Sequence, residues 1–197
     1  MTYRTQLFRP GILTIAFFIL TSIGWSNCIA QEGNENEESF HPHHQLGLVI
    51  SHAHVFDGRD DAGKKKVLSL PSWGIDYTYN FHPRWGVGLH TDIIVEKYKV
   101  EEHGGEIIER SYPVAPALMG VYKPGGHWSF LLGMGAEFAK EENLALTRAG
   151  IEYSGELPGH WEVFGSLAYD IKWSEYDSWL LGIGIAKLLG KRKHRHK

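Results

Sequence analysis

The sequence predicts an all-β fold, an eight-stranded antiparallel up-and-down transmembrane β-barrel. Eight segments alternate large apolar residues with small or polar ones, which is the period of a strand with one apolar face. Three short turns each begin with tyrosine and end with tryptophan, and the rings of these residues favour the headgroup level of a bilayer. The connections between strands alternate between short and long, as they do in transmembrane barrels.

The first 30 residues have the features of a secretory signal peptide, predicted over 1–30. Arg4 and Arg9 precede an apolar stretch, and Ala30 is a small residue at the expected cleavage point. The apolar stretch is shorter than the roughly 20 residues of a spanning helix, so a membrane segment in the mature chain must be β. Cleavage would remove Cys28, the single cysteine, which excludes disulfide and thiol chemistry.

Charge and composition divide the mature chain into three parts. Residues 31–44 are predicted to be a flexible N-terminal segment because they begin with a polar, acidic run. The barrel is predicted over 45–189, and 190–197 form a basic tail. The whole chain has a formal net charge of −3, and the tail holds much of its positive charge. An acidic body argues against binding of nucleic acid, which requires a basic surface.

The eight strands follow one another along the chain, each with one face of large apolar residues. The first covers 45–56, and strands starting at Trp85, Trp128, Trp161 and Trp179 are long enough to cross a bilayer at about 9 to 11 residues each. The other seven expected apolar faces are Trp73, Ile75, Tyr77 and Tyr79; Val87, Leu89, Thr91, Ile93 and Val95; Tyr112, Val114, Pro116, Leu118 and Tyr122; Phe130, Leu132, Met134, Ala136 and Phe138; Ala145, Thr147, Ala149, Ile151 and Tyr153; Val163, Leu167, Tyr169 and Ile171; and Trp179, Leu181, Ile183 and Ile185.

The connections place the aromatic residues at two levels. The short turns lie between Tyr79 and Trp85, Tyr122 and Trp128, and Tyr153 and Trp161, whereas 57–66 and 96–111 are long, charged loops. An even number of strands puts both termini at the level of the short turns. The predicted aromatic girdle consists of Tyr79, Trp85, Tyr122, Trp128, Tyr153 and Trp161 at this level, with Trp173 and Trp179 at the other.

On these strands, aromatic levels and turns, the segment 45–189 resembles the small eight-stranded outer-membrane β-barrels of Gram-negative bacteria, the OmpA/OmpX-like superfamily, and most closely its single-barrel members. The resemblance implies a non-enzymatic protein of the cell outer membrane, with both termini periplasmic and no cofactor. Its implied partners are outer-membrane lipid and the β-barrel assembly machinery. Such barrels commonly finish on an aromatic residue, whereas this strand ends Lys187-Leu188-Leu189-Gly190.

If the apolar faces meet lipid, a set of mostly acidic side chains points into the lumen. Buried ionised groups must pair, bind a cation or take up protons, so Arg148 is expected inside an acid cluster. Because an eight-stranded barrel is just wide enough for side chains to fill, the expected lumen is a packed polar plug. The predicted lumen charge cluster is Asp76, His90, Asp92, Glu137, Arg148, Glu152, Glu162 and Asp170.

A narrow cation or proton channel is the first alternative function. Pairing Tyr153 with Trp161 across the third turn would set Glu152 opposite Glu162. Directly opposed carboxylates repel, so a proton, a bridging cation or a shifted register is required. A soluble, lipocalin-like ligand-binding barrel remains a further alternative, because alternation alone does not distinguish the inside of a barrel from its outside.

Other side chains offer weaker candidates for chemistry. His52 and His54 share a face of one strand and supply two possible metal ligands, although zinc or copper usually needs a third. A lipid-modifying enzyme would need a serine, a base and an acid in contact. His127 with Ser129 does not meet this requirement, because the histidine lies in a turn and the serine points to the lumen, so no catalytic residue is assigned.

The two long loops suggest a role at the surface instead. The first carries Lys64, Lys65 and Lys66, and the second is strongly acidic. Loops held on a rigid barrel are a common place for binding. The sequence therefore predicts a structural or surface-interaction protein, with a possible extracellular ligand at these loops.

Overall fold

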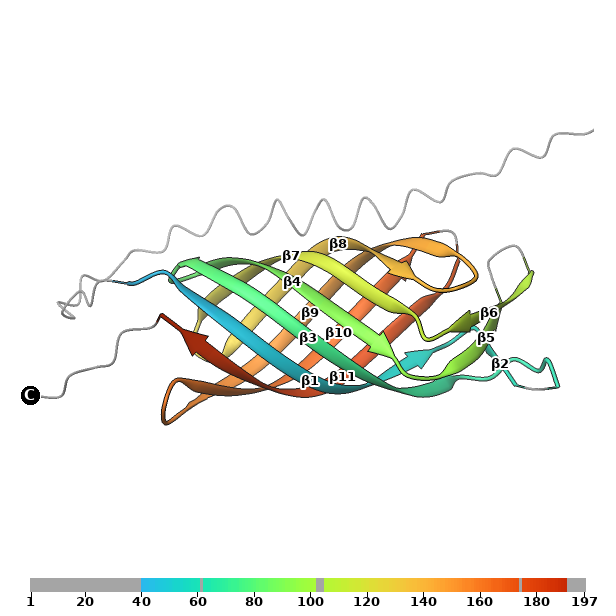
Figure 1. The fold of residues 1–197 in the computed structure, drawn as a ribbon, viewed down its shortest axis with the longest axis horizontal. Coiled ribbons are helices and arrows are strands. Elements are labelled where there is room, and N and C mark those ends of the chain that lie inside the picture. The colour runs from blue at the N-terminus through green and yellow to red at the C-terminus, as the bar shows by residue number, and fades with distance from the viewer. Residues whose placement is uncertain (1–39, 61, 102–104, 174, 191–197) are drawn as a thin grey trace, which may run out of the picture. The chain divides into compact units, whose positions relative to one another are not determined.

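Eight long antiparallel strands close into a barrel in a computed structural model, which describes residues 40–60, 62–101, 105–173 and 175–190. Each wall strand pairs with its neighbours along the chain, and the first pairs with the last (Figure 1). The predicted eight-stranded antiparallel barrel is confirmed. The wall strands are β1 His43–Val55, β3 Leu68–His82, β4 Trp85–Ile94, β7 Val114–Gly125, β8 Trp128–Phe138, β9 Asn143–Leu157, β10 Trp161–Lys172 and β11 Asp177–Leu189.

The start of β1 and the end of β11 lie side by side. His44 of β1 pairs with Leu189 of β11, at the end of the barrel that carries the short turns. Strand β1 begins at His43, so the last residues of the expected flexible segment belong to the wall. The predicted signal peptide and almost all of the basic tail lie outside the described residues. Within the described ranges, no helix is long and apolar enough to cross a membrane.

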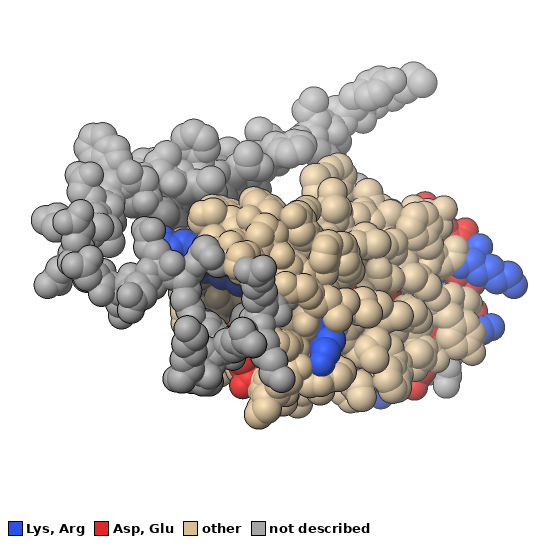
Figure 2. Space-filling model, turned by 60° about the vertical axis from the view of Figure 1, so that its left-hand side comes forward, with Lys and Arg blue, Asp and Glu red and all other residues tan. Residues whose placement is uncertain are grey.

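The strands alternate as the sequence predicts, with large apolar side chains outward. On β11, for example, Leu181, Ile183 and Ile185 are 59, 70 and 44% exposed, while Leu180 before them and Ala186 after them are buried. Most of the wall that faces the viewer in Figure 2 is free of charged atoms, and charged side chains gather towards the end that carries the long connections. The barrel therefore presents an apolar belt to its surroundings.

Aromatic pairs mark the end with the short turns, but they join neighbouring hairpins. The rings of Trp85 and Tyr122 lie 4.6 Å apart, and those of Trp128 and Tyr153 lie 4.9 Å apart. At the opposite level Trp179 packs on Tyr169 at 4.6 Å, and Trp173 donates a hydrogen bond to Thr147. All eight girdle residues therefore occupy the two ends of the strands.

The third turn differs from its predicted form. Strand β9 continues to Leu157, which pairs with Trp161, so Tyr153 is not opposite Trp161. The chain reverses within 158–160, where Gly159 and His160 have positive φ angles of 81° and 61°. A tight turn at Pro158-Gly159 extends the hairpin by four residues on the first strand, and every cross-strand pair in it moves accordingly.

Both predicted long loops contain strands. The short strands β2 Gly58–Arg59, β5 Lys97–Glu101 and β6 Ile107–Ser111 form a separate three-stranded sheet beyond the wall (Figure 1). Most of the predicted long loop over 96–111 is a hairpin, because Tyr98 and Val100 alternate with charged residues and bury their side chains, at 5 and 0% exposure. We call β2, β5 and β6 the outer sheet.

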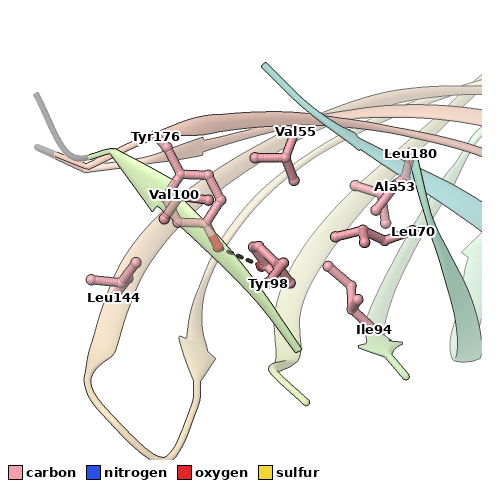
Figure 3. Packing of buried hydrophobic residues seen from close by; sticks show 9 residues of the cluster. All are labelled: Ala53, Val55, Leu70, Ile94, Tyr98, Val100, Leu144, Tyr176 and Leu180. Carbon is pink, nitrogen blue, oxygen red and sulfur yellow. Dashed lines mark hydrogen bonds between the residues drawn. The ribbon is translucent and has the colours of Figure 1, made fainter. Parts of the chain in front are cut away.

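Apolar clusters fill much of the lumen. The largest lies beneath the outer sheet, where the hydroxyls of Tyr98 and Tyr176 lie 2.7 Å apart across the barrel mouth (Figure 3). At the other end Phe164 is buried against Gly184, and a Cβ at that glycine would lie 2.4 Å from the ring. The members of the large cluster are Ala53, Val55, Leu70, Ile94, Tyr98, Val100, Leu144, Tyr176 and Leu180.

Candidate functional site

The charged lumen is the candidate site, and its centre is a three-residue ion cluster. Arg148 on β9 donates from Nε and Nη2 to both oxygens of Asp170 on β10, at 2.6 and 2.7 Å. Its remaining nitrogen, Nη1, pairs with Asp92 on β4. Because β4 lies across the lumen from β10, the guanidinium ties opposite walls together. Arg148 and Asp170 are only 3 and 2% exposed, so this cluster is a strong, nearly dry contact.

A second cluster closes the outer mouth around Glu137 of β8. Arg110 of the outer sheet donates to Glu137 Oε1 from Nη2 at 2.6 Å and from Nε at 3.1 Å. The Tyr176 hydroxyl donates to the same oxygen at 2.7 Å, and Lys172 Nζ lies 3.4 Å from the other. Glu137 and Arg110 are 1 and 0% exposed. The acid therefore has several partners, and the mouth is filled by a paired polar core.

The charge states of this outer cluster follow from its surroundings. Burial alone would lower the pKa of Arg110, but the adjoining Glu137 carboxylate raises it above its usual value, so the guanidinium stays charged. Burial, and then the same carboxylate, raise the pKa of the Tyr98 phenol far above its usual range. Tyr98 therefore stays neutral and can donate a hydrogen bond.

The third group lies nearer the short turns. Asp76 of β3, His90 of β4 and Glu152 of β9 place one ligand-type atom each within 4.8 Å of one another. His90 Nδ1 is 3.6 Å from Asp76 Oδ1, and its Nε2 is 3.1 Å from the Thr78 hydroxyl. These three lumen residues border two small cavities of about 40 and 20 Å³. The larger cavity also reaches Asp92 and Arg148 of the first cluster.

The predicted opposition of Glu152 and Glu162 is wrong. Because β9 extends to Leu157, the residue opposite Glu152 on β10 is Ser166, and Glu162 faces Glu156. Glu162 accepts a hydrogen bond from Gln45 Nε2 at 3.1 Å. The two acids are therefore at different levels of the barrel and belong to different contacts.

The remaining candidates lie apart from the lumen groups. His52 and His54 point outward from β1. Within the described part of the chain, the group of three or more potential metal ligands is the one at His90, and it includes neither of them. His127 contacts the carbonyl of Ser154 at 2.8 Å, whereas Ser129 is buried in the wall.

Sequence reasoning missed Arg110, Tyr98 and Tyr176. Arg110 and Tyr98 lie in segments interpreted as solvated loop, and Tyr176 lies in a short connection. A usable signal was present for Tyr98, since Lys97–Glu101 alternates charged and apolar residues with period two, whereas Ile107–Ser111 around Arg110 does not. No local pattern marks Tyr176, whose contact with Glu137 joins positions 39 residues apart.

No protein-family model matches the sequence, and no curated protein matches it. Among solved structures, the chain is similar to Ail, the attachment invasion locus protein of Yersinia pestis, in complex with the heparin analogue sucrose octasulfate, at 18% identity and a TM-score of 0.46 over 75% of this chain and 99% of that one. It is also similar to the outer membrane protein OprG of Pseudomonas aeruginosa, at 16% identity and a TM-score of 0.49 over 76% of this chain and 96% of that one. Neisserial surface protein A is similar at 9% identity and a TM-score of 0.44, over 73% of this chain and 96% of that one.

Proposed function

We propose that the chain is an integral, non-enzymatic barrel of the cell outer membrane, with a plugged lumen and a surface-interaction role. The observation that carries the proposal is the apolar belt. Leu118, Leu132 and Ile183 are 64, 66 and 70% exposed, and similar residues surround them on every wall strand. Monomeric soluble proteins rarely expose contiguous apolar patches above a few hundred Å². Contact with lipid removes the free-energy cost of exposing such a surface to water.

The aromatic levels support the proposed membrane position. Tryptophan and tyrosine rings occupy both ends of the strands, as in the girdles of transmembrane barrels. Short turns face the periplasm in such proteins, so the turn at Gly126, the start of β1 and the end of β11 are assigned to that side. The outer sheet is then extracellular. Outer-membrane lipid and the β-barrel assembly machinery are the partners that this placement requires.

Two cross-lumen ion clusters support a plug over a conduit. The Arg148 cluster joins β9, β10 and β4, and the Arg110 cluster fills the outer mouth. Ions passing the lumen would have to break buried, charge-assisted contacts at two levels. The channel alternative predicts steady single-channel currents from the purified protein in planar bilayers, whereas a plug predicts none.

The surface role is assigned to the outer sheet. A groove of about 400 Å³ lies against it and is lined by both basic and acidic side chains, including Arg59, Lys97 and Glu109. An ion pair between Arg59 and Glu101 joins β2 to β5, and one between Lys65 and Asp57 joins the connections on either side of β2. A concave, mixed-charge surface on a rigid support is suited to a polar extracellular ligand.

Fractionation tests the membrane assignment directly. The full-length protein, expressed with its own leader, should separate with outer membranes. It should also migrate faster on a denaturing gel before heating than after heating, because a folded barrel resists detergent. Recovery in the soluble periplasmic fraction, with no change of migration on heating, would contradict the proposal.

A further inference from the structure

Three strands bring together the side chains of a potential cation site inside the barrel. Asp76 and His90 are cross-strand partners on β3 and β4, and Glu152 reaches the same point from β9 across the lumen. One ligand-type atom from each lies within 4.8 Å of the other two. Two carboxylates and one imidazole form a donor set that suits zinc and similar divalent metals.

The imidazole of His90 has one ring nitrogen fixed and one available. The side chain is 7% exposed, and Nε2 lies 3.1 Å from the Thr78 hydroxyl. Nδ1 faces Asp76 Oδ1 at 3.6 Å, which is too long for a hydrogen bond. When Nε2 carries the proton and donates a hydrogen bond to the Thr78 hydroxyl, the lone pair on Nδ1 points to the carboxylates. Such an arrangement is how metal-binding histidines are oriented.

The two carboxylates of this group lack the cation that their neighbours have. Arg148 uses its guanidinium on Asp92 and Asp170. Among the described residues, no Lys or Arg nitrogen forms an ion pair within 4 Å of Asp76 or Glu152. Lys123 lines the cavity next to Glu152 but lies beyond that distance. Buried carboxylates in this position favour protonation or a bound cation.

Space for an ion and its water is present on both sides of the group. Cavities of about 40 and 20 Å³ share Asp76, His90 and Glu152 in their linings. A single water needs roughly 10 to 15 Å³ of such space. In a tetrahedral site with bonds of roughly 2.0 to 2.2 Å, the ligand atoms stand about 3.4 Å apart. Each distance between ligand atoms would therefore have to shorten by at most about 1.4 Å to close this group around an ion.

We propose that Asp76, His90 and Glu152 bind one divalent metal ion of the zinc class, with water as the fourth ligand. Thr78 acts as a positioning residue by holding His90 in the binding tautomer. The ion would link β3, β4 and β9 across the inner half of the lumen. This ion would be a resident part of the barrel. Its binding requires the barrel fold but not the proposed membrane role.

The test is a zinc titration of the mature full chain, folded with Zn²⁺ present so that the lumen is accessible. Competition with a chromophoric chelator measures affinity and stoichiometry. The background carries His41→Asn, His43→Asn, His44→Asn, His52→Asn and His54→Asn, and His194→Asn and His196→Asn in the tail, so that these other histidine groups do not contribute. Binding of one Zn²⁺ per barrel is expected. Absence of stoichiometric binding in this background overturns the proposal, whatever the variants do.

Variants then locate the ion. Glu152→Gln and Asp76→Asn should each weaken binding by at least about 100-fold, and Thr78→Val by about 10- to 100-fold, as loss of a supporting contact does elsewhere. Glu142→Gln is the control, because that exposed acid lies between β8 and β9 at the outer end of the barrel, and it should bind as the background does. Heat-dependent migration reports folding of each variant. Unchanged affinity in folded Glu152→Gln or folded Asp76→Asn would show that zinc binds elsewhere and would overturn the assignment.

Discussion

The outer and inner halves of the lumen both contain buried acids, but the acids have different partners in the two halves. At the outer mouth, Glu137 has Arg110, Lys172 and Tyr176 around it and an apolar cluster above it. In the inner half, Asp76 and Glu152 border cavities, and among the described residues neither has a Lys or Arg nitrogen within 4 Å. The number of charged residues in the lumen therefore does not decide the role of the lumen. What separates a structural plug from a candidate binding site is whether each acid already has its cation.

The largest expected effect comes from the cluster between the two halves. Arg148→Ala leaves Asp92 and Asp170 buried without their partner, and breaking a buried pair in this way costs about 3 to 5 kcal/mol. Urea unfolding in lipid vesicles, followed by tryptophan fluorescence, measures the free energy of unfolding. Arg84→Ala, in an exposed turn, is the control and should change little. An unchanged unfolding curve for Arg148→Ala would contradict the role assigned to this cluster.

A substitution in the outer cluster tests whether the plug there is structural. Glu137→Gln keeps the shape of the side chain but removes the charge that faces Arg110 and Lys172. The loss should be about 3 kcal/mol of unfolding free energy, at the lower end of the cost of breaking a buried pair. The same urea experiment measures it. A stability equal to that of the unmodified barrel would remove the contrast with the inner half.

The comparison of two lumen halves assumes that the outer wall faces lipid, and a pair of substitutions on β11 tests this. Ile183→Arg, near the middle of the strand, should cost about 2 to 4 kcal/mol in a bilayer, and Leu189→Arg, at its end, about 0 to 1. Both positions are exposed, at 70 and 46%. In water both changes would be nearly neutral, so equal and small effects in vesicles would argue for a soluble barrel.

The smallest expected effect belongs to the inner half without metal. With a chelator present, Glu152→Gln should not lower the unfolding free energy, because the buried arginines pair with other acids and the change breaks no such ion pair. Ser129 and Ser166, its cross-strand partners, keep their positions. A loss as large as that of Glu137→Gln would mean that Glu152 is as firmly paired as the outer acid.

Local alternation was enough to predict the wall of this barrel, because a residue's position in a strand decides whether it faces in or out. It therefore gave the inward direction of Asp92, Arg148 and Asp170 and the outward direction of Ile183. It did not give which inward residues meet, since contacts across the lumen depend on how far each strand is staggered against the next. The third turn illustrates this, because an unrecognised tight turn after Leu157 moved Glu152 and Glu162 apart.

The outer mouth was predicted least well for a related reason. Arg110 belongs to a short charged hairpin that looks solvated in sequence, and its carboxylate partner, Glu137, is reached by tertiary packing. A hairpin of five-residue strands is marginal on its own. Its formation depends on the apolar cluster that Tyr98 and Val100 join, and that cluster is not visible in the hairpin's own sequence.

The seam between β1 and β11 has a consequence for how the barrel is made. The pairing of His44 with Leu189 joins almost the two extremes of the described chain, so the contact with the greatest sequence separation is also the one that completes the cylinder. Until β11 arrives, β1 and β10 each have a free edge, and such edges invite pairing with other chains. Closing a loop of this length is slow compared with forming a hairpin. Assembly therefore needs an environment that shields two open edges until the C-terminal strand has been delivered.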